Sequence, residues 1–319
     1  MRRALVIYNP AAGRFSVRPF ISGAVQELES AGWKAEAVKT QSGAHAVELA
    51  KQAVSEKMDA AFAVGGDGTI GQVASGLLDS DTALGILPAG TANVLAVELG
   101  LPIFSWTNWW ALRQNAATLA REAPTCAVDI VRCNGQPFLL WAGMGLDAMT
   151  IHAIEPRLRV EKFFAFPEYF GTTVWNASQW NGVRLRLWAD DQEVEGNFLV
   201  AVANNIRRYM GGLAILSPDA HMDDGQFDIW LLSGHSLVDV FRHAYDLWRG
   251  RHLDSDSARR IPFNNLRVEA DTPFLVQTDG EPRPATREVT IGIHPRALKL
   301  LMPVKSLHLL ANQPTLTKV

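Results

Sequence analysis

The stretch AAFAVGGDGT, residues 60–69, decides the fold of the first part of the chain. An apolar run ends in glycines, an aspartate and a threonine, a pattern typical of a buried strand that passes through a loop into a helix. Glycines allow positive φ and leave no Cβ in the way of an anion, and backbone N–H groups at a helix N-terminus bind phosphate. Because Asp67 would repel a bare phosphate, the loop predicts a nucleotide phosphate together with Mg²⁺, and hence phosphoryl transfer.

The residues around this loop alternate between short apolar runs and helical repeats. Strands are expected over 4–9, 33–40, 59–64 and 83–88, and helices over 17–31, 42–56, 69–78 and 106–122, with another starting near Val94. Strands that alternate with helices predict a parallel sheet covered on both faces, which is a three-layer α/β domain.

The pattern changes after Ala123-Pro124. Short β-like runs follow at 125–133, 137–143, 183–189, 194–203, 227–232, 266–270, 274–278 and 288–294, separated by turn signals such as Asp279-Gly280. Helical segments are expected over 160–180 and 236–250. This half predicts an antiparallel β-sandwich.

Composition restricts the class of protein. A chain of 319 residues suits two domains, and a net charge of −3 argues against a nucleic-acid binder. The two cysteines, Cys126 and Cys133, are expected in the core of a protein kept in a reducing cytoplasm. No apolar run approaches the roughly 18 residues of a membrane span, and the first apolar run is too short for a signal peptide. A homodimer is compatible with the sequence.

Gly66, Gly68 and Gly71 also fit the dinucleotide-binding fingerprint. That fingerprint needs an acid about 20 residues further on, at the end of the next strand. The expected strand here ends in Leu87-Pro88-Ala89-Gly90-Thr91, which contains no acid. The fingerprint also normally follows the first strand of its domain, and no Walker sequence is present. Phosphate and metal binding therefore remains favoured over dinucleotide redox chemistry and over a simple tight turn.

Three more loop positions lie at the ends of expected strands: 9–13, Thr40, and 90–93. In an open parallel sheet, ligands bind beyond the carboxyl ends of the strands. Each loop alone has an ordinary explanation as turn or cap chemistry. Four polar or glycine-rich loops at one edge of a sheet predict a site.

Six motifs, in this order along the chain, now allow a comparison with a known family. They are 9–13, 65–69, 87–93, 143–148, 218–228 and 279–281. With them the sequence resembles the diacylglycerol kinase catalytic-domain family, above all the soluble bacterial lipid kinases, which are related to sphingosine and ceramide kinases. The resemblance spans nearly the whole chain.

The resemblance implies a nucleotide domain over 1–124, completed by 295–319, and a β-sandwich lipid-substrate domain over 125–294. The implied reaction transfers the γ-phosphoryl group of ATP to the hydroxyl of a diacylglycerol-like, sphingoid or ceramide lipid. The implied nucleotide-binding residues are Asn9, Thr40, Gly65, Gly66, Asp67, Gly68, Thr69, Thr91 and Asn93.

The resemblance also assigns catalytic and metal-binding roles. Asp67 would act through Mg²⁺, and Glu281 would accept the proton of the lipid hydroxyl, with Asp279 as the rival base. A second Mg²⁺ site is implied at His221, Asp224 and Gln226, where Asp224 supplies the carboxylate. Many diacylglycerol kinase-like members have an acid directly after the equivalent of Asn93, whereas this chain has Val94, as some sphingoid-lipid kinases do.

Access to a lipid substrate implies peripheral contact with a membrane, here the inner membrane surface. The aromatic and basic segment 157–170 is the expected contact, and Trp106, Trp109 and Trp110 have a similar composition. The same aromatic residues would also suit a core. Two alternative functions stay open, an NAD kinase and a non-catalytic lipid- or nucleotide-binding protein.

Overall fold

The structure is a computed structural model that describes residues 1–154 and 182–312, and the chain divides into two compact units. Unit 1 contains Met1–Ile130, Met222–Asp224 and the chain from Pro295 onward; unit 2 contains Val131–His221 and Gly225–His294. Two of the divisions fall inside strands, β5 (Thr125–Cys133) and β15 (Glu281–Leu301). Unit 1 is therefore discontinuous in sequence.

Unit 1 is built on a parallel sheet, as the sequence predicts. The sheet has the order β2-β1-β3-β4, and the end of β15 adds beside β4, where Leu300 pairs in parallel with Leu84. Every residue of β3 and β4 is buried, as expected of apolar strands covered on both faces. The strands are β1 (Arg2–Tyr8), β2 (Trp33–Lys39), β3 (Ala60–Gly65) and β4 (Ala83–Pro88).

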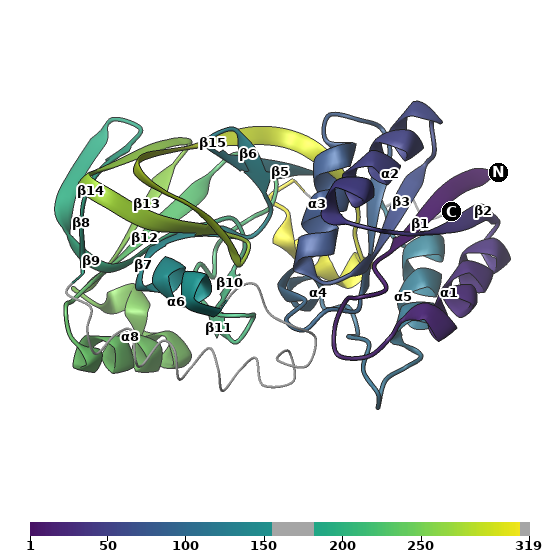
Figure 1. Ribbon diagram of the computed structural model, residues 1–319, viewed down its shortest axis with the longest axis horizontal. Coiled ribbons are helices and arrows are strands. Elements are labelled where there is room, and N and C mark those ends of the chain that lie inside the picture. The colour runs from purple at the N-terminus through teal and green to yellow at the C-terminus, as the bar shows by residue number, and fades with distance from the viewer. Residues whose placement is uncertain (155–181, 313–319) are drawn as a thin grey trace. The chain divides into compact units, whose positions relative to one another are not determined.

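Helices cover both faces of this sheet, which confirms the three-layer α/β prediction (Figure 1). On one face α2 packs against α3, and on the other α1 packs against α5. Ser42 begins α2 because its hydroxyl accepts a hydrogen bond from the His45 N–H at 3.1 Å. The helices are α1 (Arg18–Ser30), α2 (Gly43–Ser55), α3 (Asp67–Leu77), α4 (Val94–Glu98) and α5 (Ala111–Arg121).

Unit 2 is an antiparallel β-sandwich, also as predicted. Its strands have the order β13-β12-β9-β7-β14-β15, and β8 pairs with both β9 and β14. The long strands β9 and β14 pair with β8 along one half and with β7 along the other, so they wrap around a shared core. The strands are β6 (Gln136–Phe138), β7 (Trp141–Gly145), β8 (Val183–Ala189), β9 (Gln192–Asn204), β12 (Phe227–Ser233), β13 (Ala258–Phe263) and β14 (Asn265–Thr278), with the short pair β10 (Arg208–Tyr209) and β11 (Ala214–Ile215).

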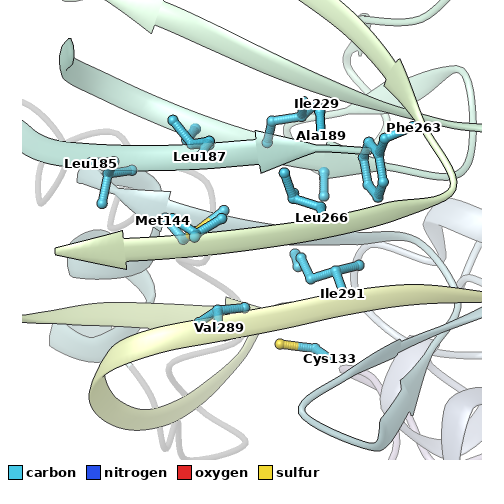
Figure 2. Packing of buried hydrophobic residues seen from close by; sticks show 14 of the residues in the cluster. Cys133, Met144, Leu185, Leu187, Ala189, Ile229, Phe263, Leu266, Val289 and Ile291 are labelled. Atoms are coloured by element: carbon cyan, nitrogen blue, oxygen red, sulfur yellow. The ribbon is translucent and has the colours of Figure 1, made fainter. Parts of the chain in front are cut away.

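The core of unit 2 is filled by side chains from most of these strands. Figure 2 shows Met144 of β7, Leu187 of β8, Leu266 of β14 and Ile291 of β15 pointing into one apolar cluster. Cys133 belongs to the same cluster, and Cys126 is also buried. Burial raises the pKa of each thiol to about 11, so both are core residues, as predicted, rather than nucleophiles.

The structure differs from the sequence-based expectation at several elements. The helix expected over 106–122 begins only at Ala111, and α6 (Leu146–Ile154) and β13 were not expected. β14 and β15 are each one long strand. The expected helix over 236–250 is confirmed as α8 (Leu237–Arg249), which begins in a reciprocal cap between Ser236 and Asp239. The segment expected to be helical over 160–180 lies outside the described residues. The described residues also contain the short 3₁₀ turns η2 (Arg251–Asp254) and η3 (Val304–Leu309).

Candidate functional site

The strand register of unit 1 brings the four loops to one edge of the sheet. Tyr8 at the end of β1 pairs with Lys39 of β2 and Val64 of β3, and Gly65 pairs with Pro88 of β4. The ladder continues into the loops, because the Asn9 N–H donates to the Val64 carbonyl at 3.0 Å. The Thr40 N–H likewise donates to the Tyr8 carbonyl at 2.9 Å. Asn9, Thr40, Gly66 and Ala89 therefore follow neighbouring strands at the edge where the sequence predicts ligand binding.

The glycine loop is shaped by close packing rather than by unusual backbone angles. Gly65, Gly66 and Gly68 all have negative φ, so the expectation of positive φ at these positions is wrong. A Cβ on Gly65 would lie 2.6 Å from the Cβ of Thr69, and a Cβ on Gly66 would lie 3.1 Å from the Cα of Gly90. The glycines let the loop turn tightly into α3, whose first residue is Asp67.

Gly90 is a residue that the sequence analysis did not assign to the site. A Cβ on Gly90 would lie 2.2 Å from the Cα of Gly66, which no side chain can occupy. Gly13 makes a similar approach with φ +61°, and a Cβ there would lie 2.2 Å from the Ala89 carbonyl oxygen. The signal was present in the sequence, since both glycines stand in the motifs that carry the family resemblance. Their role is to let three loops approach one another backbone to backbone.

Asp67 connects the glycine loop to the loop before α4. Its Oδ1 accepts a hydrogen bond from the Leu95 N–H at 3.3 Å. The side chain is half-buried, and removal from water raises the pKa of this carboxyl above 3.8, against the lowering effect of backbone N–H groups at Val94, Leu95, Asp67 and Asn93. Among residues 1–154 and 182–312 no basic side chain forms an ion pair with this carboxylate, so the position fits a bound Mg²⁺.

Asn93 closes the loop between β4 and α4. It is fully buried and adopts a left-handed conformation with φ 53°. Its Oδ1 accepts from the Gly90 N–H at 2.7 Å, and its Nδ2 donates to the Gly90 carbonyl at 2.9 Å. Val94, the residue after Asn93, is buried. Thr91 is exposed at the tip of the same loop.

Asn9 and Thr69 meet across the first and third loops. The Asn9 Nδ2 donates to the Thr69 Oγ1 at 3.1 Å, while the Asn9 Oδ1 accepts from the Ala11 N–H at 2.9 Å. Thr69 and Thr40 are buried. Within unit 1 the structure thus links Asn9 to Thr69 and Asp67 to the loop that contains Thr91 and Asn93.

The Asp279-Gly280-Glu281 motif lies in unit 2, at the hairpin turn between β14 and β15. Thr278 pairs with Glu281 across the turn, and Asp279 and Gly280 have φ of 53° and 80°. Both central residues therefore have the positive φ of the tight hairpin turn that the Asp-Gly pair favours.

The carboxylate of Asp279 is occupied by the backbone. It accepts hydrogen bonds from the N–H groups of Leu139 and Leu140, both at 2.8 Å, and of Trp141 at 3.3 Å. Its own N–H donates to the Trp141 carbonyl at 3.0 Å. The side chain of Glu281 is by contrast 50% exposed, and its nearest cation, Arg283, lies 3.9 Å away. The two acids of the motif thus have different surroundings.

A further buried link supports this turn. The Gln277 Oε1 accepts from the Gly280 N–H at 2.8 Å, and its Nε2 donates to the Asp147 Oδ2 at 2.6 Å. Asp147 lies at the start of α6, directly after the glycine pair of β7. No local pattern in the sequence signals this contact, since 130 residues separate its two ends.

The residues of the expected second Mg²⁺ site lie in the turn before β12. Asp224 and Gln226 are exposed and His221 is half-buried. The described residues contain no group of three or more His, Cys, Asp or Glu side chains placed to hold a metal ion. The expected site uses only one carboxylate, and it stays a prediction. The neighbouring Asp223 was missed: it accepts from the Ala311 and Asn312 N–H groups at 2.6 and 3.1 Å, which fixes the end of the described chain.

The aromatic residues considered for membrane contact are only partly described. Trp106, Trp109 and Trp110 are exposed in unit 1, so they are not core residues. The segment 157–170 lies outside the described residues. None of the helices described is long and apolar enough to span a bilayer.

Both units match models of known protein families. Residues 3–133 match the family model described as diacylglycerol kinase catalytic domain, and residues 142–302 match that described as YegS C-terminal NAD kinase beta sandwich-like domain. A diacylglycerol kinase of Bacillus subtilis (strain 168) is 28% identical over 289 residues, which cover 88% of this chain and 90% of the relative. One of Staphylococcus aureus (strain MRSA252) is 26% identical over 285 residues, covering 88% and 86%.

Solved structures agree at the level of the fold. The crystal structure of a diacylglycerol kinase from Bacillus anthracis superposes with a TM-score of 0.75 at 23% identity, over 95% of this chain and 98% of that one. An NAD kinase from Archaeoglobus fulgidus, in complex with ATP, superposes with a TM-score of 0.53 at 13% identity, over 96% of each chain. The TM-score is higher for the diacylglycerol kinase than for the NAD kinase, and at these sequence identities both comparisons show the fold alone.

Proposed function

The chain belongs to the diacylglycerol kinase catalytic-domain family and is a lipid kinase, and we propose that it transfers the γ-phosphoryl group of ATP to the hydroxyl of a diacylglycerol-like lipid, with Mg²⁺. The relatives named above carry the name diacylglycerol kinase, and the chain covers most of their length. The lipid, the nucleotide and the metal are the parts that we propose.

The observation that carries the proposal is the surroundings of Asp67. A half-buried carboxylate, with a pKa raised by desolvation, lies at the N-terminus of α3 beside the glycine loop. Backbone N–H groups at a helix N-terminus attract phosphate oxygens, while a carboxylate there attracts a divalent cation. Together they favour a nucleotide phosphate with its metal over either one alone.

The residues of unit 1 have the roles of binding and orienting the donor. The N–H groups of the glycine loop would hold phosphate oxygens, and the hydroxyls of Thr40, Thr69 and Thr91 would contact the nucleotide. Asp67 would hold Mg²⁺, which when bound neutralises charge on the phosphate oxygens. Phosphoryl transfer needs mainly positioning and charge neutralisation from the protein, and this loop edge supplies both.

The acceptor hydroxyl must lose a proton as its oxygen bonds to the γ-phosphorus and the bond to the bridging oxygen of ADP breaks. A carboxylate within hydrogen-bonding reach can take that proton. Asp279 already accepts three backbone N–H groups, so both of its oxygens have backbone partners. We therefore assign the role of base to Glu281, whose side chain is open to solvent.

The experiment is an assay with γ-labelled ATP and Mg²⁺ over dioleoylglycerol, sphingosine, ceramide and NAD. We expect label in phosphatidic acid and none in NADP. Label in a sphingoid product would keep the reaction class and change the lipid, an outcome that Val94 leaves open. Label in NADP, or binding of lipid and ATP without any transfer, would contradict the proposal.

A further inference from the structure

Helix α8 has an apolar stripe that the described residues of unit 2 leave exposed. Val238, Phe241, Tyr245 and Trp248 are 75%, 47%, 49% and 73% exposed. Their spacing of three, four and three residues places them along one side of the helix. A stripe of this kind is unusual on the surface of a monomer, where exposed apolar residues are normally scattered singly.

The neighbouring side of α8 packs against the β-sandwich. Val240, His243, Ala244 and Leu247 face an apolar pocket of about 70 Å³ that strands β9 and β12 and helix α6 also line. His243 and Leu247 are buried there. The apolar arc of α8 is therefore wider than packing against the sandwich requires, and the stripe, from Val238 to Trp248, is the part left over.

The composition of the stripe fits a bilayer surface. Tyr245 and Trp248 have ring centroids 6.2 Å apart, and these two residue types favour the interface between lipid and water because each joins an apolar ring to a polar group. The Arg249 guanidinium lies 5.8 Å from the Trp248 ring. A cation beside an interfacial tryptophan is well placed for an anionic headgroup.

Positive charge beside the stripe also favours an anionic lipid surface as the partner. Arg242 and Arg249 follow the stripe around the helix by less than half a turn, and Arg251 follows in η2. All three are exposed. Asp239 pairs with Arg242 at 2.9 Å, so part of the charge of Arg242 is already matched, and Arg249 and Arg251 argue more strongly for an anionic partner. Exposed arginines next to apolar rings are complementary to anionic lipids.

The size of the stripe argues against a second copy of the chain as its partner. With about 150–250 Å² per aromatic side chain, the four exposed side chains offer on the order of 500 Å². A stable protein interface buries roughly 800 Å² on each partner. The stripe is thus too small for a stable dimer, and it is large enough for one helix lying flat in a bilayer surface.

We propose that the stripe Val238–Trp248 of α8, with Arg242, Arg249 and Arg251, is a docking surface for anionic lipid bilayers. It is separate from the segment 157–170 considered above. The proposal goes beyond phosphoryl transfer, since lying on a bilayer requires neither ATP nor a base.

Co-sedimentation with vesicles tests the proposal in the absence of ATP. The vesicles are phosphatidylcholine with phosphatidylglycerol, and phosphatidylcholine alone. The double variant Phe241→Glu/Trp248→Glu is expected to bind the mixed vesicles about tenfold more weakly or worse, because two charges replace the rings that enter the apolar layer. The variant Arg249→Gln/Arg251→Gln is expected to lose the preference for the anionic vesicles.

Val304→Glu is the matched control, since Val304 is 43% exposed but lies in unit 1. It is expected to bind as the unmodified chain does. Far-UV circular dichroism and thermal unfolding verify each fold, and Phe241→Ser/Trp248→Ser replaces the charged variant if that variant unfolds.

Unchanged vesicle binding by a folded stripe variant would overturn the proposal, as would an equal loss from Val304→Glu. A stable dimer in sedimentation velocity that only the stripe variants dissociate would also overturn it, in favour of a second copy. Absence of lipid phosphorylation with normal vesicle binding would reject the kinase proposal and leave the docking surface standing.

Discussion

The charge of Asp67 is needed for the proposed Mg²⁺ binding, but burying that charge lowers the stability of the unliganded protein. Burial raises the pKa of its carboxyl above 3.8 even though backbone N–H groups surround it. The native state therefore holds the proton of this group more tightly than the unfolded chain does. The contribution to stability is complete below pH 3.8 and is lost as the pH rises through the pKa of the folded state.

Replacing Asp67 with Asn should abolish transfer while making the unliganded protein more stable. Asn keeps an oxygen for the Leu95 N–H but carries no charge to desolvate. The difference in melting temperature between Asp67→Asn and the unmodified chain should grow as the pH rises from about 4, then level off. Differential scanning calorimetry without nucleotide or Mg²⁺ measures it.

Asp81→Asn is the control for this experiment. Asp81 is exposed, and a hydrogen bond from Lys299 lowers the pKa of its carboxyl, so its contribution is lost on acidification and the sign is opposite. Equal melting temperatures of Asp67→Asn and the unmodified chain at every pH would contradict the assignment of a desolvated charge. Retained turnover would contradict the role of Asp67 in catalysis.

Substitutions of the two acids in the β14–β15 turn should have different effects, one on turnover and the other on stability. Glu281→Gln is expected to unfold like the unmodified chain, within roughly 0.5 kcal/mol, and to lower kcat by about 10²–10⁴-fold. Asp279→Ala is expected to cost roughly 3 kcal/mol or more of unfolding free energy, because three backbone N–H groups lose their acceptor.

Urea unfolding and lipid kinase turnover, measured on both variants, provide the comparison. A stable Asp279→Ala that has lost activity, together with an active Glu281→Gln, would reverse the assignment of the base.

At the scale of helices and strands, the sequence predicts what periodicity and turn residues control. The strands and helices of unit 1 follow from alternating apolar runs, and α8 follows from its cap and apolar spacing. β13 was not predicted because two arginines and a proline interrupt its apolar pattern. Only Ile261 and Phe263 of this strand are buried. β15 was shortened because three prolines interrupt it, and prolines normally mark edges or irregular positions.

The candidate site could likewise be predicted only where a local sequence pattern marks it. The strand ends could be predicted because each loop has its own glycine or polar signal. The anchoring of Asp279 by residues 139–141 could not, because those partners lie 138–140 residues away and no local pattern marks them. Contacts between distant segments depend on packing, which the sequence alone does not reveal.

Gly90→Ala tests whether the loops that contain Gly66 and Gly90 must touch. A methyl group there would lie 2.2 Å from the Gly66 Cα, so the loops must separate, at a cost of roughly 1–3 kcal/mol. ATP affinity should fall as well, since the glycine loop moves.

Gly292→Ala is the matched control, because its Cβ would meet only the Asn265 Oδ1, at an ordinary 3.5 Å. Thermal unfolding and ATP titration of both variants measure the difference. Identical behaviour of the two would show that the loop contact is not required.

At the scale of the whole molecule, unit 1 depends on a segment far away in sequence. Residues 295–312 add a strand end beside β4, where Leu300 pairs with Leu84. The Asp79 N–H donates to the Ala297 carbonyl at 2.8 Å, and the Met302 N–H donates to the Pro124 carbonyl at 3.0 Å. The buried apolar residues of this segment are Ala297, Leu298, Leu300, Leu301, Met302, Leu307, Leu309 and Leu310.

A chain shortened to end at His294 should therefore lose the fold of unit 1 and keep that of unit 2. Eight buried apolar side chains represent on the order of 10 kcal/mol, comparable with the whole stability of a domain. Limited proteolysis with mass spectrometry should show cleavage throughout 1–130 and protection of the β-sandwich.

A chain ending at Asn312 is the control and should resist proteolysis in both units. Protection of 1–130 in the shorter chain would show that this part folds without the later segment.

The discontinuity of unit 1 also sets an order of events on the ribosome. All residues of unit 2 have been synthesised once the chain reaches His294, whereas β4 still lacks its neighbour. Domains generally fold as units during synthesis. The nascent chain can complete its sandwich first, and the glycine loop obtains its finished sheet only after Pro295 and the residues that follow have emerged. A nascent kinase of this architecture therefore completes the sheet behind its proposed donor site late.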